Sequence, residues 1–390
     1  MNMDQLNQKR VRVQTEADSD RIDLNASDVI KFYFDDCQEG VPPGFVHQNF
    51  EINGVLSCPK NQVPLSIDVH VNSKDLSANL AFSHSGSADD IGFRVFVSDV
   101  ISRLTTACDL GNGCKPATYP GGFALTPTLD AMTPSETFQL TDGYYVERYQ
   151  SSLFNGSSLN LWKRAEWLML WSIESVTQSD HENDENWEYY FLRDTSGCIN
   201  AMCSVYKFPS FALLSENKTL GERMRLSQFL TVPSKWNKGT GSRLLRFLAE
   251  YVIGRPDVDM LSMEDPSFGM TSMRESVYLA IAKNDHLMNE ESIDVIGHRL
   301  KVPHSFAKRI LSLLEIEKLR KGRKVSASLV NEIIHSGNKF VNNFIDKIEF
   351  YDDEETDEPV PLSEDKSVKL INESIQGALL KLEKVMSSGA

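Results

Sequence analysis

The sequence lacks the patterns that mark metal-bound or disulfide-linked proteins. It contains no Cys-x-x-Cys pair, and its 8 histidines are scattered without metal-ligand spacing. The 6 cysteines are Cys37, Cys58, Cys108, Cys114, Cys198 and Cys203. Small secreted domains depend on paired cysteines, and zinc sites need closely spaced ligands. We therefore expect reduced thiols in a reducing compartment, and no metal.

Long apolar runs are also missing. The N-terminus shows no apolar stretch of the signal-peptide kind, and the longest apolar cluster, Trp167–Trp171, is far shorter than the roughly 20 residues that span a bilayer. We therefore expect an intracellular protein without a membrane partner.

Positive charge is scarce as well. The 40 Lys and Arg residues are outnumbered by 55 Asp and Glu residues, which gives a formal net charge of −15. A negative protein repels phosphate backbones, so nucleic acid is disfavoured as a direct ligand and a basic partner is favoured. Acidity that serves solubility alone remains the alternative.

The length and composition predict a folded protein of several domains. Hydrophobic residues make up 41% of the 390 residues, which at about 150 residues per domain predicts two or three domains. We predict a flexible tail at 1–24, an α+β domain at 25–155, a central α/β domain at 156–284 and a helical region at 285–390.

Periodicity and turn residues define the expected elements. In the N-terminal domain they predict strands at 29–34, 64–71 and 78–83, a helix at 93–108 and a long domain-bridging loop at 109–136. In the central domain they predict a tryptophan-rich helix at 159–175, a hairpin of 187–193 with 198–208, and a half-buried strand at 223–231. In the C-terminal region they predict helices from about 285 and an acidic linker at 352–358.

The most informative segment follows that half-buried strand. A Gly239-Thr240-Gly241 turn leads into a helix at 242–252, a short strand at 257–263, and then Glu264. A glycine turn at a helix start directs free backbone N–H groups at an anion, such as the pyrophosphate of a nucleotide cofactor. The turn has neither the Walker lysine nor a third glycine, so a plain strand-to-helix turn is the alternative.

The residues around this turn resemble a known family. Met224–Gln228, Gly239–Gly241 and Glu264–Ser267 together resemble the type B histone acetyltransferase catalytic subunit, a member of the GNAT acetyltransferase superfamily. Trp171–Glu174 and the acidic loop that ends in Trp187 agree with it. The resemblance is strong from about residue 162 to residue 274. It implies an α/β GNAT fold, with a smaller N-terminal α+β domain and a C-terminal helical region.

The resemblance also implies an acetyl-CoA site. The cleft between two splayed strands would hold the pantetheine arm, and the glycine turn would hold the pyrophosphate. The implied residues are Phe229, Leu230, Thr231, Trp236, Asn237, Lys238, Gly239, Thr240, Gly241 and Ser242. Trp236 departs from the Arg or Gln that the superfamily has there, and we expect this to weaken cofactor binding. Asn237 stands where glycine is common, and Asn tolerates positive φ.

The chemistry implied is acyl transfer to a lysine. A lysine amine has a pKa of about 10.4 in water, so it must lose a proton before it attacks a thioester. By resemblance Glu264 is the general base, with Asp265 and Glu174 assisting. The alternatives are that Asp265 is a helix N-cap, followed by Pro266 at the first helical position, and that Glu174 is a surface acid on the tryptophan-rich helix.

The implied substrate is the tail of newly made histone four (H-four), recognised by Trp187, Tyr206, Lys207 and Phe208. The implied partner is a WD40-repeat histone chaperone, and the expected location is nucleus and cytoplasm. Two rival functions stay open at this point. One is an acetyltransferase for small amines or other proteins, and the other is a histone-binding scaffold that no longer holds CoA.

Overall fold

The computed structural model describes residues 21–35, 37–44, 55–87, 91–106, 122–124, 132–154, 156–174, 176–180, 184–211, 220–287 and 292–320. They form two compact units. The first unit comprises the described residues between Met1 and Leu248 together with Ser262–Glu264. The second comprises Ala249–Leu261 and the described residues after Asp265. The mixture of sheets and helices confirms the α/β fold class.

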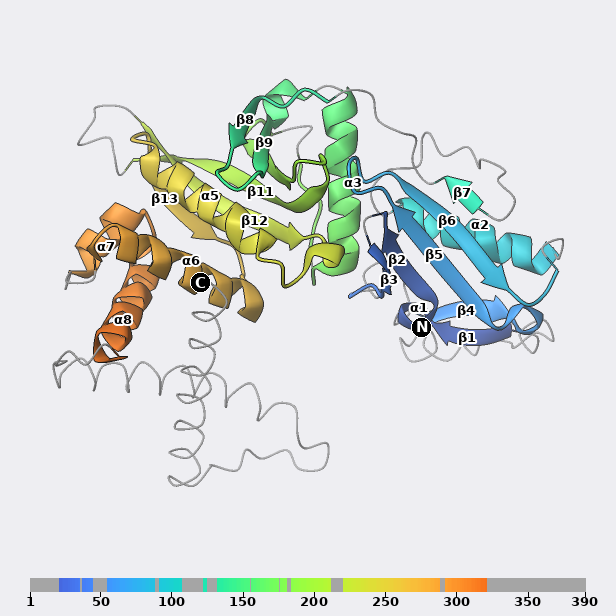
Figure 1. The fold of residues 1–390 in the computed structure, drawn as a ribbon. Helices are drawn as coiled ribbons and strands as arrows, with labels where there is room; N and C mark the ends of the chain where they lie inside the picture. Colours follow the sequence, from blue (N-terminus) through green and yellow to red (C-terminus); the bar gives the residue numbers. More distant parts are fainter. Residues whose placement is uncertain are drawn as a thin grey trace, which may run out of the picture. The chain divides into compact units, whose positions relative to one another are not determined.

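The N-terminal part of the first unit is a five-stranded sheet with the order β3-β2-β5-β6-β7. The elements of this part are β1 (Arg21–Asn25), α1 (Ala26–Val29), β2 (Ile30–Phe34), β3 (Cys37–Val41), β4 (Val55–Pro59), β5 (Leu65–Val71), β6 (Ala78–His84), α2 (Ile91–Thr106) and β7 (Gly122–Ala124). Strands β2 and β5 are parallel, and β5 buries alternate residues as a strand with one covered face does. Figure 1 shows this sheet in blue, with β7 in teal.

Two predictions for this region are corrected. Residues 21–24, predicted as the end of a tail, belong to β1, which pairs with β4 as a separate two-stranded sheet. Cross-strand pairing satisfies the backbone groups that a solvated tail would leave to water. Most of the predicted loop at 109–136 lies outside the described residues, but residues 122–124 form strand β7.

The second sheet has six strands with the order β13-β12-β11-β10-β9-β8. They are β8 (Glu136–Gln139), β9 (Tyr145–Gln150), β10 (Trp187–Arg193), β11 (Ile199–Ser210), β12 (Gly221–Thr231) and β13 (Val258–Met263). From β8 to β12 each pair is antiparallel. Because β8 and β9 pair into this sheet, the central domain begins before the boundary predicted at residue 156.

Helix α3 (Gly156–Ser172) lies between the two sheets, as Figure 1 shows. The ring centroids of Trp162 and Tyr189 are 3.8 Å apart, and those of Trp167 and Phe32 are 5.8 Å apart. Trp162 also donates its indole N–H to Ser179 Oγ at 3.0 Å. One helix face therefore packs on β10 and another on β2.

Helix α5 (Thr240–Gly254) connects β12 to β13. The second unit continues with α6 (Phe268–Asn284), α7 (Ile293–Leu300) and α8 (His304–Arg320). Helices α7 and α8 agree with the helices predicted from about residue 285, and residues 321–390 lie outside the described part of the chain. Tyr278 packs edge-on against Phe306 with centroids 5.4 Å apart, and the Arg274 guanidinium lies 3.6 Å from the Phe306 centroid. The acidic linker at 352–358 lies outside the described residues.

The packing of α3 makes a stability prediction. Trp162 is fully buried, so Trp162→Ala removes a large apolar surface and the indole N–H that donates to Ser179 Oγ. We expect the free energy of unfolding to fall by about 3–5 kcal/mol in urea titrations followed by circular dichroism. Leu153→Ala is the control, because that side chain is 64% exposed and its loss should change stability by less than about 0.5 kcal/mol. Equal effects would contradict the role of α3.

Candidate active site

A row of side chains crosses the six-stranded sheet and ends at Glu264. Trp187 on β10 lies opposite Tyr206 on β11, and Tyr206 lies opposite Arg225 on β12. Arg225 Nε is 3.3 Å from Glu264 Oε2, just beyond the end of β13. Figure 1 shows β11, β12 and β13 side by side. Residues distant in sequence thus form one continuous track.

A β-bulge on β12 directs a hydroxyl at Glu264. Ser204 pairs with Gln228 and Val205 pairs with Leu226, which leaves Ser227 as the extra residue. Bulges bend a strand and change the direction of a side chain. Ser227 Oγ donates to Glu264 Oε2 at 2.8 Å, and the Glu264 backbone N–H donates to the Leu226 carbonyl at 3.0 Å. Backbone and side chain together hold Glu264 against β12.

The two carboxylate oxygens of Glu264 have different surroundings. Oε2 accepts the hydrogen bond of the Ser227 hydroxyl, and Arg225 Nε lies within ion-pair distance of it without a hydrogen bond. Oε1 has no hydrogen bond or ion pair to the residues that the structure describes, and the side chain is 44% exposed. One oxygen is therefore anchored, and the other can accept a proton from solvent or from a ligand.

The two acids predicted to assist Glu264 are differently placed. Asp265 is exposed, has φ of 31°, and does not cap α6. The N-cap is Ser267, whose side chain accepts from the Met270 N–H, so the alternative N-cap interpretation of Asp265 was wrong. Glu174 is exposed and lies beyond the last residue of α3, not on the helix as predicted. Within the described part of the chain, no hydrogen bond or ion pair joins Glu174 to Glu264.

Three of the predicted substrate residues form an aromatic cluster. The ring centroids of Trp187 and Tyr206 are 4.9 Å apart, and those of Tyr206 and Phe208 are 4.6 Å apart. Tyr206 donates to Asp184 Oδ2 at 2.6 Å. This hydrogen bond is the main reason that the pKa of Tyr206 is raised, and it lowers the pKa of Asp184. The Arg225 guanidinium carbon lies 4.8 Å from the Phe208 centroid, which connects the cluster to Glu264.

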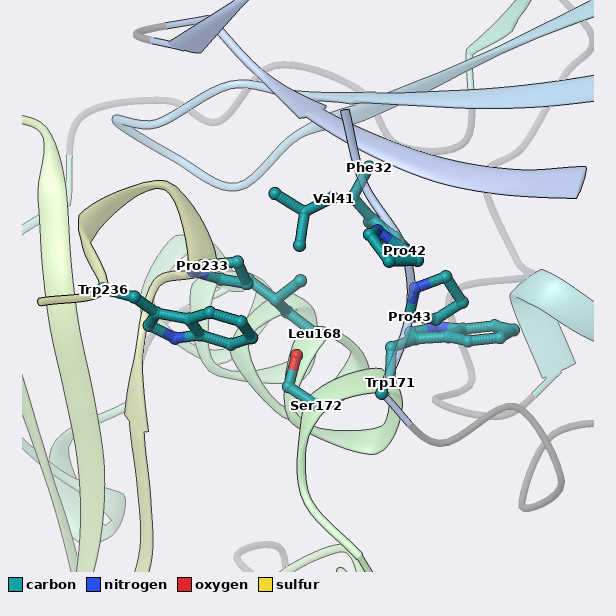
Figure 2. Close-up of a pocket in the computed structure, with 10 residues that line it drawn as sticks. Phe32, Val41, Pro42, Pro43, Leu168, Trp171, Ser172, Pro233 and Trp236 are labelled. Atoms are coloured by element: carbon teal, nitrogen blue, oxygen red, sulfur yellow. The ribbon is translucent and has the colours of Figure 1, made fainter. Parts of the chain in front are cut away.

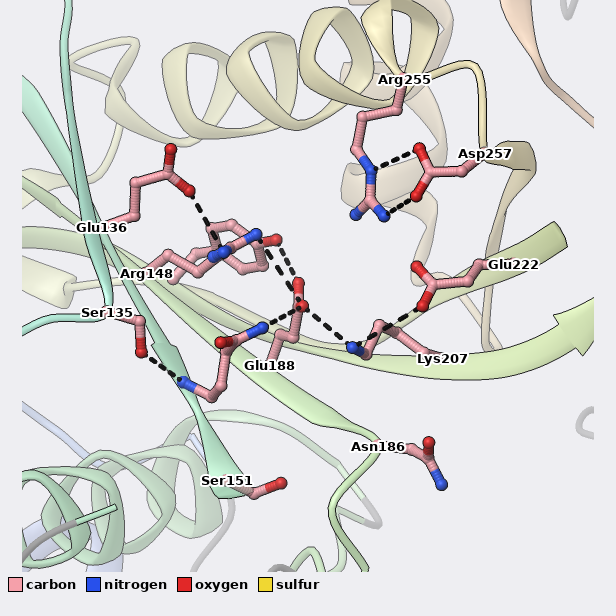
Figure 3. Close-up of polar contacts among 12 residues, drawn as sticks. Ser135, Glu136, Arg148, Ser151, Asn186, Glu188, Lys207, Glu222, Arg255 and Asp257 are labelled. Atoms are coloured by element: carbon pink, nitrogen blue, oxygen red, sulfur yellow. Dashed lines mark hydrogen bonds and ion pairs between the residues drawn. The ribbon is translucent and has the colours of Figure 1, made fainter. Parts of the chain in front are cut away.

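Lys207, the fourth predicted substrate residue, lies on the opposite face of the sheet. Successive residues of a strand point to opposite faces, so Lys207 cannot join its neighbours Tyr206 and Phe208. Its ammonium lies 3.3 Å from Glu188 Oε1 and 3.9 Å from Glu222 Oε1. Figure 3 shows Lys207 directed at these two carboxylates. A place for Lys207 in the aromatic cluster is therefore ruled out by strand alternation.

Glu188 is the centre of this second polar group. Its carboxylate accepts from the Tyr190 hydroxyl at 2.6 Å and from the Gln150 amide at 3.3 Å, and Arg148 lies 4.0 Å away. Burial alone raises the pKa of Glu188, but the hydrogen bond from Tyr190 and the charges of Lys207 and Arg148 outweigh burial and lower it. Glu188 is thus a buried carboxylate with several partners, and its removal would leave those partners uncompensated.

The glycine turn has the backbone geometry of an anion cradle. Asn237 and Gly239 have φ of 59° and 74°, so both occupy the left-handed region that Asn and Gly tolerate. The Arg243 N–H donates to the Gly239 carbonyl as the first helical hydrogen bond. The N–H groups of residues 240–242 therefore precede the helical ladder, as the first amides of a helix do. Lys238 Nζ donates to the Ser234 carbonyl at 2.8 Å and so braces the turn.

Trp236 is engaged in a way that the sequence did not indicate. Its indole N–H donates to the carbonyl of Thr231, the last residue of β12, at 2.8 Å. It also lines a small pocket of the first unit, shown in Figure 2. The pocket is lined by Phe32, Val41, Pro42, Pro43, Gly44, Leu168, Trp171, Ser172, Pro233 and Trp236. Trp236 thus lines one pocket together with Phe32, Val41 and other residues of the N-terminal part of the chain.

Two residues of the site had no role predicted from sequence, namely Arg225 and Ser227. Their alternation with Met224 and Leu226 was the available signal, because it puts both on the exposed face of β12. Among the described residues, no group of three or more His, Cys, Asp or Glu is arranged to hold a metal ion. No helix among them is both long and apolar enough to cross a membrane.

The Glu188 group makes a pH prediction. Because the folded-state pKa of Glu188 is lowered, its stabilising effect is present above the unfolded pKa of about 4.3 and is lost as pH falls through the folded value. We expect Glu188→Gln to lower the free energy of unfolding by about 1–3 kcal/mol at pH 7. In urea titrations below about pH 4, the difference in free energy of unfolding between wild type and Glu188→Gln should become smaller.

Glu136→Gln is the matched control for this prediction. Glu136 also pairs with Arg148, at 3.2 Å, but its side chain is 46% exposed. Exposed pairs contribute little, so the control should change stability by less than about 1 kcal/mol. A Glu188→Gln deficit that is the same at both pH values would contradict the prediction.

Comparison with known proteins gives relatives of one kind. The chain matches no protein-family model. It is 24% identical over 243 residues to the "Histone acetyltransferase type B catalytic subunit" of Pyricularia oryzae, covering 54% of this chain and 52% of that protein. It is 30% identical over 134 residues to the protein of the same name from Debaryomyces hansenii, covering 33% of this chain and 32% of that protein.

Solved structures overlap the chain only in part. The acetyltransferase domain of xEco2, bound to a CoA conjugate, gives a TM-score of 0.28 at 9% identity, covering 37% of this chain and 92% of that one. The structure of Arabidopsis thaliana NAA60 in complex with acetyl-CoA gives a TM-score of 0.27 at 14% identity, covering 35% of this chain and 82% of that one. The matched part of the chain spans about half the length of the Pyricularia protein and about a third of the Debaryomyces protein. Over that part the chain is similar to type B histone acetyltransferase catalytic subunits.

Proposed function

We propose that this protein is an acetyl-CoA-dependent lysine acetyltransferase that acts on the N-terminal tail of histone four (H-four). The observation that carries the proposal is the placement of Glu264. Its carboxylate is anchored on β12 through Ser227 at 2.8 Å, and β12 runs on from there to the glycine turn. The similarity to histone acetyltransferases supports the same reaction.

The residues of the turn suit the cofactor. An anion at a helix start needs free N–H groups and a backbone that leaves room for it. The amides of residues 240–242 precede the helical ladder, and Asn237 and Gly239 supply the left-handed backbone. These residues would hold the pyrophosphate, with Phe229–Thr231 beside the pantetheine arm. When bound, acetyl-CoA supplies the activated acetyl group.

The residues of this chain then have defined roles in the transfer. Glu264 accepts a proton from the lysine ammonium, directly or through water, and its unanchored Oε1 is the oxygen available for it. The neutral lysine nitrogen would then bond to the acetyl carbon while the carbon–sulfur bond breaks. The sulfur would leave with the bonding electrons and take up the proton that the nitrogen loses as the amide forms. Asp265 and Glu174 are proposed as auxiliary acids because both are exposed. No metal is required for this step.

The substrate is proposed to reach Glu264 along the row of side chains. Trp187, Tyr206 and Phe208 offer apolar and aromatic surface, and the Asp184 carboxylate beside them suits basic residues of a tail. The formal net charge of −15 favours a basic partner in the same way. Lys207 has no part in this surface, because it pairs with Glu188.

The partner and location rest on the resemblance alone. We propose that the enzyme works with a WD40-repeat histone chaperone and acts in nucleus and cytoplasm, where newly made histones are found. Co-purification of the tagged protein with its partners from cell fractions tests both. Recovery of histones without a WD40-repeat protein would contradict the proposal that such a chaperone is the partner.

A second candidate function is a histone-binding scaffold without catalysis. The observation that favours it is Trp236, which stands where the superfamily has Arg or Gln and which binds the Thr231 carbonyl through its own indole. Mass spectrometry of the protein incubated with acetyl-CoA and core histones, with polyamines in parallel, separates the candidates. Acetylated histone four supports the proposal, acetylated polyamine indicates a small-amine enzyme, and no product with retained histone binding indicates the scaffold.

The glycine turn generates a cofactor prediction. Gly241→Asp puts a carboxylate among the amides that would hold the pyrophosphate. We expect CoA affinity to fall by at least tenfold, about 1.4 kcal/mol, in isothermal titration calorimetry. Unchanged affinity would remove the turn from the site.

Trp236→Gln is the matched variant in the same turn. It restores the side chain that is usual at this position, so CoA should bind equally or more tightly. A large loss would mean that Trp236 itself contacts the cofactor.

Glu264 generates a catalytic prediction. Glu264→Gln keeps the size of the side chain but removes its basicity, so kcat should fall by about 100- to 10,000-fold with a smaller change in KM. Activity should partly recover at high pH, where solvent supplies the free amine. Steady-state kinetics with a histone tail peptide measure this.

A triple variant that replaces Glu264, Asp265 and Glu174 by the corresponding amides tests whether another acid takes over as the base when Glu264 is lost. If the triple variant retained activity within about threefold of wild type at pH 7, carboxylate base catalysis would be excluded.

A further inference from the structure

A carboxylate next to a substrate amine creates an electrostatic difficulty. Glu264 is the proposed proton acceptor, yet an isolated carboxylate stabilises a neighbouring ammonium and raises the pKa of that amine. The proton then becomes harder to remove, because the ammonium and the carboxylate form a stable ion pair. A nearby positive charge that offsets the carboxylate weakens this ion pair, so the ammonium loses its proton more easily.

Arg225 supplies such a charge, and several contacts hold it in place. Its Nε lies 3.3 Å from Glu264 Oε2, and its guanidinium carbon lies 4.8 Å from the Phe208 centroid. Ser227 donates to the same Oε2, so both partners of the carboxylate occupy one oxygen. Oε1 therefore keeps no hydrogen bond or ion pair among the residues that the structure describes.

Stability does not explain this arrangement. The side chains of Arg225 and Glu264 are 36% and 44% exposed, and exposed ion pairs contribute little to stability. The buried Glu188 group on the opposite face is where ion pairing supports the fold. The Arg225 pair instead lies at the end of the row that starts at Trp187 and Tyr206.

We propose that Arg225 acts as a fixed positive charge that offsets Glu264 and so keeps the substrate lysine in its neutral, nucleophilic form. The inference rests on the proposed function. It assigns Arg225 a role in selecting the reactive form of the amine, and it assigns Ser227 the role of holding Glu264 Oε2 beside that charge.

The charged and titratable groups around Arg225 are few. Glu264 is its partner on the β13 side, and Asp265 follows Glu264 in the chain. On the β11 side are Tyr206 and, bonded to it, Asp184. Arg223 lies two residues earlier on β12, opposite Phe208. The pKa of Tyr206 is raised chiefly by its hydrogen bond to Asp184 and by burial, and the positive charge of Arg225 is a minor opposing effect.

The test compares single-turnover rates of acetyl transfer to a tail peptide with one acceptor lysine, from about pH 6 to about pH 10. Arg225→Gln removes the charge, and Arg225→Met is a second neutral variant. Arg225→Lys keeps the charge without the planar guanidinium. Arg223→Gln is the matched control, because it removes the same charge from the same strand and face.

We expect the rates of both neutral Arg225 variants to rise with pH about one pH unit later than those of wild type. This corresponds to about a tenfold loss at pH 7 that disappears at high pH. Arg225→Lys and Arg223→Gln should keep the wild-type midpoint. Without any ligand, Arg225→Gln should also raise the pKa of Tyr206 in titrations of isotope-labelled tyrosine by NMR, and Arg225→Lys should not.

Each other result would overturn the inference. A loss of rate that is equal at every pH would show a structural role only, and equal behaviour of Arg225→Lys and Arg225→Gln would show that charge is not the cause. A Tyr206 titration that does not change would show that the charge does not act along the row. If wild type binds CoA but transfers no acetyl group, the proposed function fails and the inference falls with it. If wild type is active but the neutral Arg225 variants have the same pH midpoint as wild type, the inference fails and the proposed function stands.

Discussion

The antiparallel pairing of β12 with β11 is the constraint on which the site depends. It fixes Arg225 opposite Tyr206, and its bulge leaves Ser227 as an extra residue that reaches Glu264. It also fixes where along β11 strand β12 ends, at Thr231 opposite Ala201, shortly before the glycine turn. A one-residue slip would send Arg225 to the face that holds Lys207 and Glu188. Register, more than any single side chain, therefore assembles the row.

The two faces of the sheet use ionic groups for different purposes. On one face Glu188 is buried: Tyr190 and Gln150 donate hydrogen bonds to it, and Lys207 and Arg148 lie within ion-pair distance, as Figure 3 shows for the two cations. On the other face Glu264 is half exposed, and only one of its oxygens is bound by the protein. A satisfied buried carboxylate stabilises the fold, whereas a partly free one can exchange a proton.

Trp236 shows how a departure from a motif can be accommodated. Its indole N–H uses the Thr231 carbonyl, and its ring lies in the pocket between β3, α3 and the turn, which Figure 2 shows. The turn is thereby held from outside, while Asn237 and Gly239 keep the left-handed backbone. The Trp236 side chain is 49% exposed, and the structure shows two contacts for it: the indole hydrogen bond to Thr231 and a place in the lining of the pocket.

The sequence by itself determined the local features of this protein. The alternation along β12, the glycine turn, the tryptophan-rich helix and the acid after β13 all depend on neighbours in the chain, so periodicity and turn chemistry were sufficient to predict them. Features that depend on contacts between distant segments were decided by the tertiary structure. These are the membership of β8 and β9 in the second sheet, the cap at Ser267 in place of Asp265, and the separation of Lys207 from Tyr206 and Phe208. The pairing of Arg225 with Glu264 belongs with them, because strand register and a bulge bring the two together and neither is encoded by spacing along the chain.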